Sequence, residues 1–146
     1  MDLFINAALI ATSIALFCYW FRYSCLLILA AETSHDYSEE VTEANQLSFP
    51  KVRSRLRTHD LTDLDHLHKC LQQDFAIITY LLEHTPVTGF DPGFDEALLT
   101  IHFRVMSACF NFTRTNLRQC ASDTLEEMCL VVAHLANQLG ERSVAA

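Results

Sequence analysis

The chain has 146 residues, of which 51% are hydrophobic, and a formal net charge of −8. From Thr58 onward the chain contains five basic and twelve acidic residues. This balance excludes the basic surface of a typical nucleic-acid binder. The six cysteines show neither C-x-x-C nor C-x-x-C-H spacing, which excludes the usual zinc-ribbon and c-type haem signatures. No G-x-S-x-G or phosphate-binding loop occurs, so the sequence contains no catalytic motif and predicts no cofactor.

The first thirty-one residues are the most apolar part of the chain, because Leu3 to Ala31 contains one charged residue, Arg22. A hydrocarbon core of about 30 Å needs about 20 apolar residues in a helix, and the charge-free run Leu3 to Phe21 nearly meets that length. A cleavable signal peptide would need a basic start and a shorter apolar run. The sequence therefore predicts a transmembrane anchor at residues 1–31, and we expect its surplus, Ser24 to Ala31, to pack against protein.

Basic residues set the predicted orientation. None precedes the apolar run, whereas Arg22 and the basic residues between 51 and 57 follow it, and the more basic flank stays in the cytoplasm. We expect a single-pass protein of the cell (inner) membrane, with its N-terminus outside and its C-terminal domain cytoplasmic. Amphipathic rings around one cation are typical of a membrane–water interface, and the candidate interface residues are Tyr19, Trp20, Arg22 and Tyr23.

Residues 32–57 change from acidic to basic. The stretch 32–45 has no Gly or Pro, which leaves open whether it is a helix or a solvated neck. After Ser48, apolar residues recur at helical spacing and Pro50 suits a first helical turn. The flanking cations either lie on anionic lipid, where each contributes about 1 kcal/mol to membrane binding, or form the solvated face of a helix packed on the domain. The candidate lipid-facing residues are Lys51, Arg53, Arg55 and Arg57.

Residues 58–146 are predicted to form a helical bundle. Apolar residues at spacings of three and four predict helices from about Asp60 to His84, from Asp95 to Thr115, and from Ser122 or Asp123 to Gly140. Asp123-x-x-Glu126 resembles a capping box, and Gly140 is expected to stop the last helix. In the middle helix one face is expected to pack on the core, with Leu99, Met106 and Phe110 beside it; this face holds Phe94, Leu98, Ile101, Val105, Cys109 and Phe112. The expected fold is all-α, an N-terminal transmembrane helix followed by a small antiparallel bundle of three to four helices.

One histidine-containing set resembles a metal site. His59, Asp63, His66 and Cys70 fall at i, i+4, i+7 and i+11, which would place them on one helical face. Four such positions span roughly 16 Å along a helix, whereas zinc needs its donors about 2 Å from one point. An adjacent pair, His59 with Asp63 or His66 with Cys70, is the most that one ion can engage, and a solvated helix face is the alternative.

These patterns favour a non-enzymatic, membrane-anchored interaction, scaffold or accessory subunit, with self-association included. The expected partners are membrane lipids, other membrane or cytoplasmic proteins and a second copy of the chain, but not nucleic acid. Two alternatives stay open: a metal- or cofactor-binding helical domain, and a membrane-surface sensor that uses the basic segment.

Overall fold

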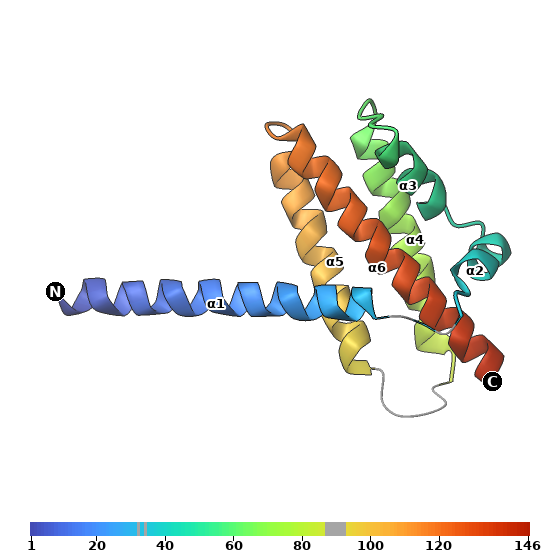
Figure 1. Ribbon diagram of the computed structural model, residues 1–146, viewed down its shortest axis with the longest axis horizontal. Helices are drawn as coiled ribbons and strands as arrows, with labels where there is room; N and C mark the ends of the chain where they lie inside the picture. Colours follow the sequence, from blue (N-terminus) through green and yellow to red (C-terminus); the bar gives the residue numbers. More distant parts are fainter. Residues whose placement is uncertain (32, 34, 87–92) are drawn as a thin grey trace. The chain divides into compact units, whose positions relative to one another are not determined.

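The computed structural model describes every residue except Glu32, Ser34 and 87–92. The described part of the chain contains six helices and no strand (Figure 1). The helices are α1 (Asp2–Ala30), α2 (Ser38–Asn45), α3 (Phe49–Arg57), α4 (Leu64–His84), α5 (Gly93–Thr113) and α6 (Arg118–Ala145). The chain divides into two compact units, Met1–Glu32 and Thr33–Ala146. The all-α prediction, with a long apolar helix followed by a helical bundle, is confirmed.

Helix α1 is long and apolar enough to span a membrane. Its 29 residues extend about 43 Å at 1.5 Å per residue. Apolar side chains surround the helix instead of forming one stripe, a distribution found in helices that are enclosed on all sides or that cross a membrane. Its hydroxyls donate to carbonyl oxygens one turn earlier, Thr12 to Ala8 at 2.8 Å and Ser24 to Trp20 at 3.0 Å. Such bonds satisfy hydroxyl groups where no water is present.

Helix α6 is the centre of the second unit. It packs against α5, α4, α2 and α3, and Figure 1 shows α4, α5 and α6 alternating in direction. Its buried residues occupy most of its length, from Ala121 to Gly140, because neighbours lie on more than one side. Large side chains from all three long helices are fully buried in this core, among them Leu71, Ile78, Leu99, Phe110, Leu125, Met128 and Leu135. Each contributes about 1.5–3 kcal/mol relative to an exposed position.

Short helices α2 and α3 both end in a left-handed residue. Gln46 and His59 each have φ of 53°, and the next N–H bonds back to a carbonyl five residues earlier, Leu47 to Thr42 at 3.1 Å and Asp60 to Arg55 at 3.2 Å. This is the Schellman arrangement. It ends α3 before His59, so α4 is a separate helix that begins at Leu64.

The structure corrects three details of the sequence prediction. Helix α6 begins at Arg118, so the Asp123-x-x-Glu126 pattern lies inside the helix instead of capping it, and Gly140 lies within the same helix. Helix α5 buries a different face from the one expected, since the buried residues are Leu99, His102, Phe103, Met106 and Phe110. Cys109 is consequently exposed. α5 is apolar over more than one face, and its neighbours decide which face is covered.

Candidate functional site

Helix α3 separates the four basic residues into two pairs. Arg53 and Arg57 line a hollow of 630 Å³ between α2 and α3, whereas Lys51 and Arg55 line a hollow of 180 Å³ beside α4. The apolar stripe of α3 is buried against the domain, where α3 contacts α4 and α6; it consists of Phe49, Val52 and Leu56. Of the two alternatives, the packed helix is therefore the one observed, and contact of its cations with lipid stays a prediction.

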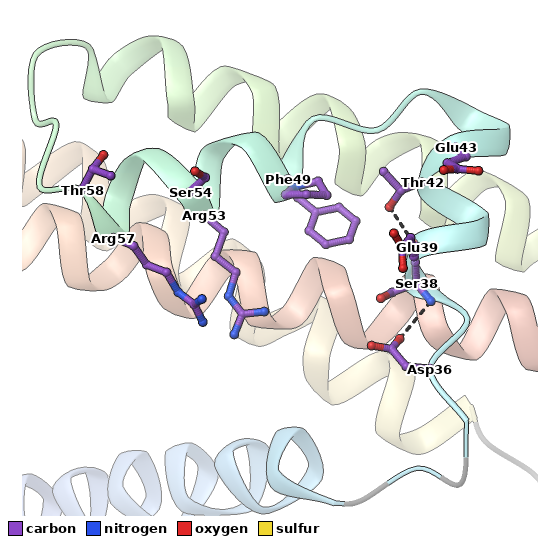
Figure 2. Close-up of a pocket in the computed structure, with 11 residues that line it drawn as sticks. Asp36, Ser38, Glu39, Thr42, Glu43, Phe49, Arg53, Ser54, Arg57 and Thr58 are labelled. Atoms are coloured by element: carbon purple, nitrogen blue, oxygen red, sulfur yellow. Dashed lines mark hydrogen bonds between the residues drawn. The ribbon is translucent and has the colours of Figure 1, made fainter.

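The larger hollow has a cationic and an anionic wall. Arg53 and Arg57 project from the same side of α3, and the Asp36 carboxylate is directed toward them from the segment before α2 (Figure 2). Glu39 and Glu43 line the hollow from α2. Among the described residues no ion pair joins these two sets of charges. The hollow therefore holds opposite charges apart, with the rest of its lining formed by Ser38, Thr42, Phe49, Pro50, Ser54 and Thr58.

The charged form of Asp36 is stabilised by its surroundings. Hydrogen bonds from the Ser38 side chain and backbone lower the pKa of Asp36, and the nearby His35 and Arg53 contribute in the same direction. The backbone bond, from Ser38 N to Asp36 Oδ1, measures 2.9 Å. Arg53 is partly buried, and its Nε is enclosed without a hydrogen-bond partner in the described part of the chain. The remaining N–H donors of this guanidinium lie at its outer end, beyond the enclosed Nε.

Asp74 on α4 holds the start of α3 in place. Its Oδ2 accepts hydrogen bonds from the backbone N–H groups of Ser48, at 2.7 Å, and of Phe49, at 2.6 Å. Burial raises the pKa of Asp74, and these two donors oppose the rise. A carboxylate from another helix thus takes the role of an N-cap side chain. No local pattern predicts this contact, because Asp74 lies 25 residues from Phe49.

The predicted metal ligands are only partly brought together. Cys70 Sγ and His66 Nε2 lie 3.7 Å apart on α4, but Asp63 is the N-cap of that helix and His59 belongs to the turn after α3. The four residues therefore do not share one helical face, because α4 starts after two of them. Across the described ranges, no three His, Cys, Asp or Glu side chains converge on one point.

A group of hydrogen bonds that the sequence does not predict joins α4 and α5. His68 Nε2 lies 2.8 Å from Ser107 Oγ, and the Gln72 amide donates to the same oxygen at 3.1 Å. Burial lowers the pKa of His68, against the opposing effect of Asp65, which favours the neutral ring. Ser107 lies inside α5, where the helix already uses the backbone N–H groups that an oxyanion hole would need. The group therefore ties α4 to α5.

A second buried histidine lies between α5 and α6. His102 is 1% exposed, and its Nε2 is 3.6 Å from Glu127 Oε2. His102 is therefore a histidine of the bundle core. The buried thiol of Cys129 lies in the same bundle, and burial raises its pKa to about 12, so it remains protonated and acts as a small apolar side chain.

The outer face of α5 is an exposed apolar stripe. Phe94 is 71% exposed, Ile101 51%, Val105 45% and Phe112 85%. Leu98 is partly exposed and Ala108 is exposed on the same face. The apolar spacing predicted that this face packs on the core, and the prediction is wrong. Monomeric proteins rarely expose contiguous apolar patches of this kind without a partner.

The predicted membrane-interface residues all lie on α1. Tyr19 and Tyr23 stack one turn apart, with ring centroids 6.4 Å apart and an interplanar angle of 11°. Their location at a membrane interface, with that of Trp20 and Arg22, stays a prediction.

A scan of protein-family models finds no match to this chain, and searches of curated proteins and of solved structures likewise find no match. The geometry described above therefore carries the functional argument.

Proposed function

We propose that the protein is a non-enzymatic, single-pass membrane subunit that is anchored by α1 and self-associates through the outer face of α5. The observation that carries this proposal is the exposed stripe of α5, which contains two phenylalanines among its most exposed residues. Burying such a face is the main source of free energy in protein association. The occupant that fits it best is a second copy of the same helix.

The stripe is complementary to itself when two copies run antiparallel. Its residues follow one another at intervals of four, three, four, three and four: Phe94, Leu98, Ile101, Val105, Ala108 and Phe112. This is a heptad pattern, and it reads the same from either end. About a two-fold axis near residue 103, Phe94 faces Phe112 of the other copy and Ile101 faces Val105. The larger Leu98 then faces the smaller Ala108, which lets the two helices interdigitate.

The exposed stripe supplies about the smallest area found in biological interfaces. A phenylalanine side chain carries about 200 Å² and an isoleucine or valine somewhat less, so the four most exposed residues present on the order of 450 Å² per copy. Pairing would bury on the order of 900 Å² from these side chains, and the flanking residues bring the total to about 1,000 Å², the lower bound for a biological interface. An isologous contact of this kind gives a closed dimer.

Light scattering of the full-length protein in mild detergent tests the proposal. We expect a dimer that becomes a monomer in Ile101→Glu and Val105→Asp, because each places a charge in the buried stripe. Tyr80→Glu is the matched control, since Tyr80 is an aromatic residue 60% exposed on α4 and should leave the dimer intact. A wild-type monomer, or equal effects of all three substitutions, would contradict self-association through α5.

Disulfide trapping tests the antiparallel arrangement. Leu98→Cys and Ala108→Cys are prepared separately, with Cys18, Cys109 and Cys120 replaced by serine because all three are exposed. We expect the mixed proteins to cross-link on oxidation more readily than either protein alone. Preferential cross-linking of each variant with itself would instead indicate a parallel pair.

The anchor and its orientation form the second part of the proposal. It rests on the apolar length of α1 and on the basic residues that follow it, which favour a cytoplasmic domain. In sealed cells we expect a membrane-impermeant thiol reagent to label a cysteine placed at Asp2, and to label Cys120 only after the membrane is opened. Labelling of Cys120 in intact cells would show that the domain lies outside the cell. Recovery of the protein in the soluble fraction would show that α1 does not anchor it in a membrane.

A further inference from the structure

The hollow between α2 and α3 presents a combination of charges that a simple anion or cation would match poorly. Its lining contains two arginines and three carboxylates, those of Asp36, Glu39 and Glu43, and so carries one net negative charge. A simple anion would be attracted by the arginines but repelled by the carboxylates. A simple cation would be attracted by the carboxylates but repelled by the arginines.

Helix α3 holds both arginines on one side, and nothing within the described residues neutralises them by an ion pair. Arg53 and Arg57 are one turn apart, a spacing at which like charges destabilise a helix. Their helix is fixed to the domain by its buried stripe and by Asp74. The two guanidinium groups are therefore held ready for an oxyanion, which arginine binds through paired N–H donors.

We propose that this hollow binds a compact zwitterion, with a phosphodiester on Arg53 and Arg57 and a protonated amine on the carboxylates of Asp36, Glu39 and Glu43. This is the chemistry of glycerophosphoethanolamine, either free in solution or as the headgroup of a membrane lipid. The amine and the phosphate satisfy the two walls together, which neither charge does alone.

The size and apolar lining of the hollow agree with such a ligand. A volume of 630 Å³ lies within the roughly 300–1,000 Å³ of small-molecule sites. Phe49 and Pro50 contribute apolar surface, against which a glycerol substituent of the phosphate can lie. The hydroxyls of Ser38, Thr42, Ser54 and Thr58 supply further hydrogen-bonding groups around it.

Calorimetric titration of the full-length protein in a nonionic detergent tests the proposal. We expect glycerophosphoethanolamine to bind at least about tenfold more tightly than glycerophosphoglycerol, which has the same phosphodiester but no amine. Arg53→Gln with Arg57→Gln should weaken glycerophosphoethanolamine binding by at least about tenfold, because it removes the charge-assisted hydrogen bonds to the phosphodiester. Equal affinity for the two compounds would overturn the proposal.

Two further variants separate recognition from folding. Lys51→Gln with Arg55→Gln removes the same charge from the same helix but on its other side, so it should bind like the wild type. Glu39→Gln with Glu43→Gln should weaken the zwitterion yet leave binding of glycerophosphoglycerol unchanged or stronger. If the Arg53/Arg57 and Lys51/Arg55 double variants have the same effect, or if the Glu39/Glu43 double variant weakens binding of both compounds, the assignment of the hollow is wrong.

A reconstituted sample distinguishes the two sources of the ligand. The protein is placed in nanodiscs of phosphatidylcholine with and without phosphatidylethanolamine, and soluble glycerophosphoethanolamine is then titrated. Weaker apparent binding in the phosphatidylethanolamine discs supports the lipid headgroup as the occupant. Equal binding in both discs supports the free compound, and absence of binding in both overturns the proposal.

Discussion

Gly140 of α6 lies directly against Tyr37, so closely that a methyl group at position 140 would overlap Tyr37 Cβ and come within 3.3 Å of Val41 Cγ2. The same junction is fixed by a hydrogen bond of 2.6 Å from the Tyr37 backbone N–H to Asn137 Oδ1. Asn137 is buried, so this bond excludes water. The start of α2, and with it the acidic wall of the hollow, is therefore positioned by one turn of α6.

Gly140→Ala should destabilise the protein, although alanine in a helix interior is ordinarily about 1 kcal/mol better than glycine. The added methyl has no room, and such overpacking costs about 1–3 kcal/mol. Urea unfolding of the full-length protein in mild detergent measures the change. Tyr37→Gly in the same background should recover part of the loss by removing the overlapping atom; a more stable Gly140→Ala protein would show that the junction is open.

Arg142→Ala should lower the free energy of unfolding by about 2–3 kcal/mol. The Arg142 guanidinium pairs with Glu96 at 2.7 Å, with side chains 10% and 19% exposed, and also donates to the Leu82 carbonyl at 3.2 Å. Its removal leaves Glu96 without its cation and a carbonyl of the last turn of α4 without its donor. The matched control is Arg114→Ala, whose ion pair with Asp65 is 46% and 63% exposed and should contribute at most about 1 kcal/mol. Equal losses in thermal unfolding would contradict this ranking.

His59→Gly and Gln46→Gly should each stabilise the protein by about 1 kcal/mol, because a side chain in the left-handed region is strained and glycine is not. Both positions have φ of 53°. His59→Ala is the control: it removes the imidazole but keeps Cβ, so it should not stabilise. The midpoint of urea unfolding measures all three, and a gain in His59→Ala equal to that in His59→Gly would assign the effect to the ring.

Asp74→Asn should change how stability depends on pH. Burial raises the pKa of Asp74 above its ordinary value of 3.8, so the folded state binds this proton more tightly than the unfolded state. In the wild type, protonated Asp74 therefore makes its full contribution to folding stability below pH 3.8. That contribution is lost as the pH rises through the folded-state pKa. The asparagine variant should therefore gain stability relative to the wild type as the pH rises through that range.

Unfolding at a series of pH values measures the Asp74 effect. A constant or falling difference would show that the two backbone donors outweigh burial. Asp74→Ala removes the acceptor altogether and leaves the Ser48 and Phe49 N–H groups unsatisfied, at about 1–3 kcal/mol each. It should be less stable than Asp74→Asn at every pH.

Helix existence followed from local patterns, whereas the buried faces followed only in part. The spacing along α4 predicts one stripe, in which Phe75 is half-buried and the other members are buried: Leu64, Leu67, Leu71, Ile78 and Leu82. In α5 two apolar faces compete, and the contact with α6 selects the one through Leu99 and Phe103. The remaining face became the proposed self-association surface.

The candidate site depended still more on contacts that are distant in sequence. Lys51, Arg53, Arg55 and Arg57 were visible as a basic group, yet the docking of α3 decides which two face the carboxylates of α2. The metal hypothesis placed His59 and Asp63 on a helix that in fact starts after them. A left-handed cap at a histidine has no strong signature in a single sequence, because glycine is the usual residue there.

The apolar length of α1, the helical character of the described chain and the acidic balance of its domain can all be predicted from the sequence. These properties depend on composition and on spacings within a few residues. Contacts between helices, in contrast, place Gly140 against Tyr37, let Asp74 cap α3 and leave the second apolar face of α5 exposed. Each of these is set by the surface that a neighbouring helix presents, and that surface exists only once the bundle has formed.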